Sequence, residues 1–143
     1  MPEHDPACPL ATLCAEAGEL IARKEAVEAR GLCATDPSER HAMDRVLDEL
    51  SLSLDNLAQR ASDFRPRSHR GALFAVALAA GELEAIEVAQ EPSPDARRRL
   101  RRHLYGLMTY LGRETPLPVA VMGYWMPPGL DPHRAREVSP ENP

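Results

Sequence analysis

The fold is decided by residues 36–64, DPSERHAMDRVLDELSLSLDNLAQRASDF, which join a helix start to a regular apolar repeat. Asp36 is a typical N-cap residue, Pro37 suits the first helical position, and Glu39 completes a capping box. The apolar residues recur every seven positions, with others interleaved: Met43, Leu50, Leu57 and Phe64, then Leu47, Leu54 and Ala61. This heptad repeat predicts a long helix that packs in the manner of a coiled coil.

Prolines divide the chain into four proline-free stretches, residues 10–36, 38–65, 67–91 and 95–115. Because proline is disfavoured inside a helix, each stretch predicts one helix. We expect the first helix to start near Asp5, with Pro6 in its first turn, and to stop at Gly31. The short link over residues 31–35 makes the first two helices an antiparallel hairpin.

The second half of the chain predicts two further helices. Ser68 is the expected cap of the third helix, and residues 71–81, GALFAVALAAG, are apolar on every face. Such a pattern predicts a helix that is buried on most sides. The fourth helix is expected between a Ser93 cap and Gly112. Its apolar stripe consists of Leu100, Leu104, Leu107, Met108 and Leu111.

The predicted fold class is therefore all-α: an antiparallel helical hairpin plus two further helices, forming a bundle over residues 1–115. Residues 116–143 form a proline-rich tail that we expect to be extended, with a disordered end. The tail carries a cluster of large apolar side chains: Val119, Val121, Met122, Tyr124, Trp125 and Met126. This cluster fits docking on the bundle of its own chain or on a partner, and the sequence leaves both open.

Residues 10–90 resemble a widespread type of short bacterial protein, often prophage-associated, in which a charged helical hairpin precedes a third, apolar helix. The resemblance is carried by the junction Pro66-Arg67-Ser68-His69-Arg70-Gly71, followed by Ala72-Leu73-Phe74. The type is uncharacterised, so the resemblance implies a fold and carries no activity or site residue.

Catalytic and metal-binding signatures are missing from the sequence. It contains no GxSxG, P-loop, GxGxxG or HExxH motif, its three cysteines form no CxxC pair, and no Glu-x-x-His occurs. We therefore expect a protein that is not an enzyme and needs no cofactor or metal. A signal peptide and a membrane-spanning run are also missing, so the expected location is the cytoplasm.

The charge of the chain is uneven along its length. Residues 1–91 hold 9 basic and 17 acidic side chains, whereas residues 92–143 hold 8 basic and 5 acidic. Four arginines of the fourth helix are candidate nucleic-acid contacts: Arg97, Arg98, Arg101 and Arg102. The overall acidity argues against this use. We instead expect the whole arginine run, which also includes Arg99, to pair mainly with the acidic end of the third helix, residues 82–91.

The favoured function is that of a non-enzymatic helical interaction or scaffolding protein that self-associates or binds a helical partner, away from membranes. Self-association is expected through the apolar face of the third helix or through the heptad face of the second. The heptad face consists of Met43, Leu47, Leu50, Leu54 and Leu57. The alternative is a nucleic-acid-binding regulator that uses the arginine-rich fourth helix.

Overall fold

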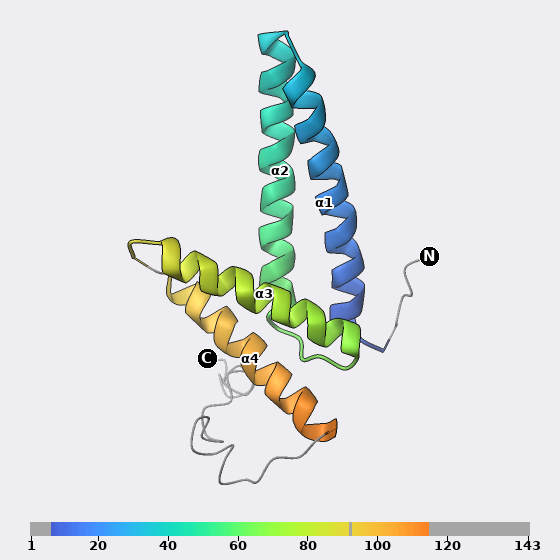
Figure 1. The fold of residues 1–143 in the computed structure, drawn as a ribbon, viewed down its shortest axis with the longest axis vertical. Helices are drawn as coiled ribbons and strands as arrows, with labels where there is room; N and C mark the ends of the chain where they lie inside the picture. Colours follow the sequence, from blue (N-terminus) through green and yellow to red (C-terminus); the bar gives the residue numbers. More distant parts are fainter. Residues whose placement is uncertain (1–6, 92, 115–143) are drawn as a thin grey trace, which may run out of the picture.

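The computed structural model describes residues 7–91 and 93–114, and these residues form four helices and no strand. The helices are α1 (Pro9–Cys33), α2 (Pro37–Ala61), α3 (His69–Val88) and α4 (Pro94–Glu114). Figure 1 shows α1 and α2 side by side as a long antiparallel arm, with the α3–α4 hairpin across its base. The predicted all-α class is confirmed, and the tail, residues 116–143, lies outside the described residues.

The predicted starts of three helices are confirmed by their capping hydrogen bonds. Asp36 Oδ1 accepts a hydrogen bond from the Ser38 N–H at 3.0 Å, at the start of α2. Ser68 Oγ accepts from the Gly71 N–H at 3.1 Å in α3, and the Ser93 hydroxyl accepts from the backbone of α4 at 3.2 Å. Each side chain satisfies a backbone donor that has no partner inside its helix.

The predicted start of α1 near Asp5 is wrong, because α1 begins at Pro9. A proline at the first helical position loses nothing, since its nitrogen would have no partner there. One turn further inside a helix, its ring would collide with the preceding turn. Pro9 therefore sets the start, and Cys8 occupies the N-cap position without a capping side chain.

The heptad repeat of α2 is used inside the arm. Met43, Leu50 and Leu57 are buried, and Ala61, the last residue of α2, is fully buried. Phe64 follows the end of the helix and is 41% exposed, so the repeat stops one heptad earlier than expected. The seam of α2 is covered by the packing of α1 and α2.

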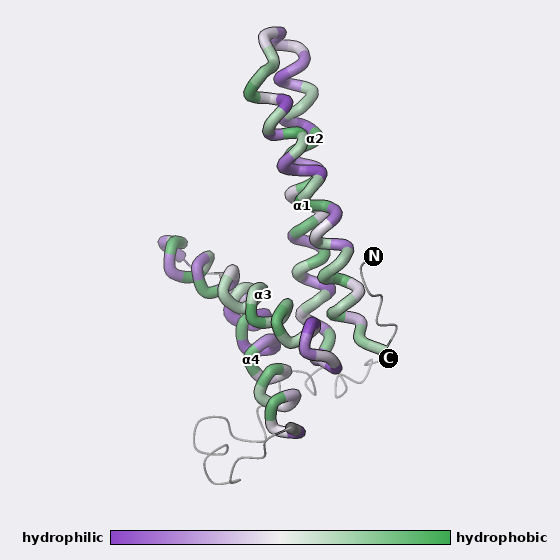
Figure 2. Tube along the Cα trace, turned by 45° about the vertical axis from the view of Figure 1, so that its right-hand side comes forward, coloured by the Kyte–Doolittle hydropathy of each residue, from purple (hydrophilic) through white to green (hydrophobic). Residues whose placement is uncertain are grey.

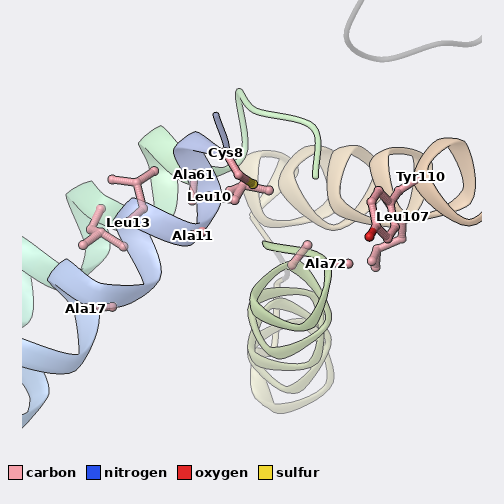
Figure 3. Close-up of a cluster of buried hydrophobic side chains, with 11 residues drawn as sticks. Cys8, Leu10, Ala11, Leu13, Ala17, Ala61, Ala72, Leu107 and Tyr110 are labelled. Atoms are coloured by element: carbon pink, nitrogen blue, oxygen red, sulfur yellow. The ribbon is translucent and has the colours of Figure 1, made fainter. Parts of the chain in front are cut away.

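The main core lies where the arm meets α3 and α4 (Figure 3). The cluster draws on all four helices and on the residue before α1. Its buried members are Cys8, Leu10, Ala11, Leu13, Ala17, Leu57, Ala61, Ala72, Ala75, Leu107 and Tyr110. Small residues let the helices approach closely: a Cβ on Gly71 would lie 2.6 Å from Cys8 Sγ and 3.2 Å from Leu10 Cβ.

The expectation that α3 is buried on most sides is wrong. Its buried residues, Gly71, Ala72, Ala75 and Ala79, form one face, which packs against α1 and α4. Figure 2 shows hydrophobic residues along the length of α3. Among the described residues no further helix covers the side of α3 that lies away from this buried face. An apolar sequence allows burial, but the number of neighbouring helices decides how much of it occurs.

Candidate interaction surface

The uncovered side of α3 carries a row of residues spaced three and four positions apart, which places them on one face of the helix. We call it the α3 row: Leu73, Val76, Ala80, Leu83 and Glu87. Leu73 is 70% exposed, Val76 50% and Leu83 46%. The apolar part, from residue 73 to residue 83, is about 15 Å long at the rise of an α-helix. An exposed apolar strip of this regularity is typical of a helix–helix contact.

The heptad face of α2, the other predicted self-association face, is not available in the same way. Met43, Leu50 and Leu57 are buried in the arm, and Leu47 and Leu54 are partly buried beside them. A second copy would reach these side chains only if α1 moved away. The α3 row is therefore the better placed of the two predicted faces.

Two arginines of α4 are held by ion pairs inside the chain. Arg102 is 8% exposed, and its Nη1 lies 3.1 Å from Asp63 Oδ1 in the link between α2 and α3. Arg99 binds both carboxylate oxygens of Glu82 and donates a further hydrogen bond to Gln59 on α2 at 3.0 Å. The hydrogen bond to Glu82 raises the pKa of Arg99 above its ordinary value, against the opposing effect of burial.

The four candidate nucleic-acid contacts therefore divide into separate environments. Arg102 is buried in its ion pair, whereas Arg98 pairs with Asp95 of its own helix at 3.2 Å and stays exposed. Arg97 and Arg101 are exposed on the surface of α4. The expected pairing of the arginine run with the acidic end of α3 occurs at Arg99, which binds Glu82, whereas Arg98 and Arg102 pair with Asp95 and Asp63 instead.

The thiol of Cys8 has a perturbed pKa, which no pattern in the sequence indicates. Burial raises its pKa, but a hydrogen bond from the Ser68 side chain, with backbone hydrogen bonds at Arg67, Ala11 and Ser68, brings the pKa below its ordinary value. The residue has no exposed surface. A substrate cannot reach a thiol in this position, so the Cys8 side chain contributes to the packing of the core.

The described residues offer little else that resembles a chemical site. In residues 7–91 and 93–114, no group of three or more His, Cys, Asp or Glu side chains is placed to hold a metal ion. A shallow depression at the tip of the arm is lined by Ala29, Arg30, Cys33, Ala34 and Glu39. None of the helices in these ranges has the length and apolar character needed to cross a bilayer.

No matched protein assigns a role to the exposed surface of α3, so its role is inferred from its own geometry. The resemblance of residues 10–90 to short bacterial helical-hairpin proteins remains an expectation from the sequence. Comparison of the chain with protein-family models, with curated proteins and with solved structures finds no match.

Proposed function

We propose that this chain is a non-enzymatic helical interaction protein that associates with further copies of itself through the α3 row. The observation that carries the proposal is the run of exposed apolar side chains at Leu73, Val76 and Leu83. They follow a three-and-four spacing on a helix whose other face is already packed. Exposure of these apolar side chains to water is unfavourable, and packing against a second helix would remove them from water.

The strength of this contact follows from the exposed area. Burying a Leu or Val side chain fully stabilises a contact by roughly 1.5–3 kcal/mol, so covering the exposed parts of these three gives roughly 3–5 kcal/mol per row. The loss of translational and rotational freedom costs about 4 kcal/mol or more. A contact that covers one such row on each of two copies gains roughly 6–10 kcal/mol, which leaves at most about 6 kcal/mol after this cost, so association is to be sought at protein concentrations on the order of 100 μM and above.

Light scattering after size exclusion, together with sedimentation velocity across a concentration series, tests the proposal. We expect the mean mass of the wild type to rise above the monomer mass with concentration. Leu73→Glu places a charge within the row and should hold the protein at the monomer mass. Leu32→Glu is the matched control, because Leu32 is 90% exposed at the far end of α1. A wild type that stays monomeric throughout the series contradicts the proposal.

The alternative function is nucleic-acid binding by α4, and the exposed positions of Arg97 and Arg101 favour it. Against it, Arg99 and Arg102 are held in ion pairs with Glu82 and Asp63. A titration of labelled duplex DNA at two salt concentrations separates the functions, because phosphate contacts give affinities that fall steeply with salt. Steep, salt-dependent binding that Arg97→Gln and Arg101→Gln abolish would favour the regulator.

A further inference from the structure

The exposed surface of α4 carries a second row with the same spacing as the α3 row. We call it the α4 row: Arg97, Arg101, Leu104, Met108 and Leu111. Leu104 is 45% exposed and Leu111 59%, Met108 is partly buried, and both arginines are exposed. Five positions at steps of three and four residues lie along one face of a helix. The buried residues of α4, such as His103 and Tyr110, lie on its other side.

The two rows match when they are placed antiparallel. The α3 row begins with apolar side chains and ends with a carboxylate, whereas the α4 row begins with arginines and ends with apolar side chains. Running one against the other aligns every position. The pairs are Leu73 with Leu111, Val76 with Met108, Ala80 with Leu104, Leu83 with Arg101, and Glu87 with Arg97. The register sets three apolar pairs together at one end and the opposite charges of Glu87 and Arg97 together at the other, with Arg101 beside Leu83 between them.

This match cannot be satisfied within one chain. The α3 and α4 helices of the same copy contact each other through their buried faces, where Arg99 binds Glu82, and both rows are exposed outside that contact. Each copy thus presents both halves of a complementary pair. Building on the self-association proposed above, we propose that the α3 row of one copy packs antiparallel on the α4 row of the next copy.

Charge complementarity selects α4 over a second α3 as the occupant. Two α3 rows packed antiparallel would set the carboxylate of Glu87 against the apolar side chain of Leu73 and would leave the α4 row uncovered. The acidic end of α3, with Glu84, Glu87 and Glu91 exposed, instead matches the arginine-bearing start of α4. Two copies form a closed two-fold dimer if both rows of each copy engage the same partner, and a ring or filament if each row engages a different copy.

Charge reversal at the matched ends tests the pairing in the full chain. Glu87→Arg and Arg97→Glu each place like charges opposite one another, so each variant alone should weaken association by about tenfold or more. An equimolar mixture of the two variants restores opposite charges in every contact between unlike copies and should associate like the wild type. Glu25→Arg and Arg45→Glu are the matched controls, because both residues are exposed on the arm. Circular dichroism of each variant verifies that it is folded.

The outcomes separate this inference from the proposed function. Loss of association in each single variant, with recovery in the mixture, supports the α3–α4 pairing. If Leu73→Glu dissociates the protein but Glu87→Arg and Arg97→Glu associate like the wild type, the α3 row binds a different surface and this inference is overturned. A mixture that fails to recover also overturns it. A wild type that is monomeric at every concentration overturns both this inference and the proposed function.

Discussion

Replacing Gly71 by alanine tests a close approach between helices, where the first turn of α3 meets the residues at the start of α1. The added Cβ would lie 2.6 Å from Cys8 Sγ, 3.2 Å from Leu10 Cβ and 3.4 Å from Ser68 Oγ. Comfortable contacts between heavy atoms are about 3.5–4.0 Å, so the overlap with sulfur is close to an ångström. Cys8 and Leu10 have no exposed surface, so neither has open space to move into.

The expected cost follows from two opposing effects. Overpacking of this kind costs about 1–3 kcal/mol, whereas exchanging glycine for alanine inside a helix gains up to about 1 kcal/mol. We expect Gly71→Ala to lower the free energy of unfolding by about 1–2 kcal/mol. Gly81→Ala is the matched control on the same helix. A Cβ there meets no atom within 4 Å, so the variant should be as stable as the wild type or more stable.

Urea unfolding followed by far-ultraviolet circular dichroism, at one fixed protein concentration, measures these differences. Cys8→Ala removes the sulfur, so Gly71→Ala should cost less in that background than in the wild type, which a double-mutant cycle detects. The packing described for this junction is refuted if Gly71→Ala is as stable as Gly81→Ala. It is also refuted if the cycle shows no coupling between positions 8 and 71.

Two further substitutions test the capping of α2 and the anchoring of α4 by urea unfolding. Asp36→Ala should lower the free energy of unfolding by about 1 kcal/mol, because the Ser38 N–H loses its acceptor. An unchanged free energy of unfolding would mean that the Asp36 cap does not stabilise the start of α2. Arg102→Gln should cost about 1–3 kcal/mol, since it breaks the ion pair of a buried guanidinium with the partly exposed Asp63. Arg101→Gln, on the exposed surface, should change stability by less than about 0.5 kcal/mol, and equal losses at the two positions would contradict this ion pair.

The helix starts at Asp36, Ser68 and Ser93 could be predicted from the sequence because a cap is a local interaction. A cap joins a side chain to backbone groups two or three residues away, so the identities of a few consecutive residues are sufficient to predict it. The start of α1 was placed too early because Pro6 and Pro9 both suit a first turn, and only the later one begins the helix.

Burial and pairing depended on distant parts of the chain and were harder to predict. The apolar composition of α3 indicated a buried helix, but among the described residues its main packing partners are α1 and α4, and Leu73 and Val76 stay exposed. The heptad repeat of α2 predicted an apolar face on this helix but did not indicate that α1 would cover that face. Asp63, the partner of Arg102, lies in a linker, and no spacing rule connects a linker carboxylate to a helix 39 residues away.

The α4 row was missed for a related reason. The sequence predicts a single apolar stripe on this helix that contains Leu104 and Leu111 together with Leu107. The structure buries Leu107 and leaves the other two exposed. Leucines at several adjacent angles of a helix cannot all face one neighbour, and the sequence alone does not say which side that neighbour occupies.

The contacts of α4 with the arm have a mechanical consequence. Arg99 reaches Gln59 near the end of α2, and Arg102 holds Asp63 just beyond it, so both contacts lie at the base of the arm. Each arm helix has 25 residues and is about 37 Å long, so a rotation of the arm about its base is amplified at its tip. A rotation of the arm by about 10° about its base would displace the tip by about 6 Å. The contacts of Arg99 and Arg102 thus lie where a small change of angle produces the largest displacement of the tip.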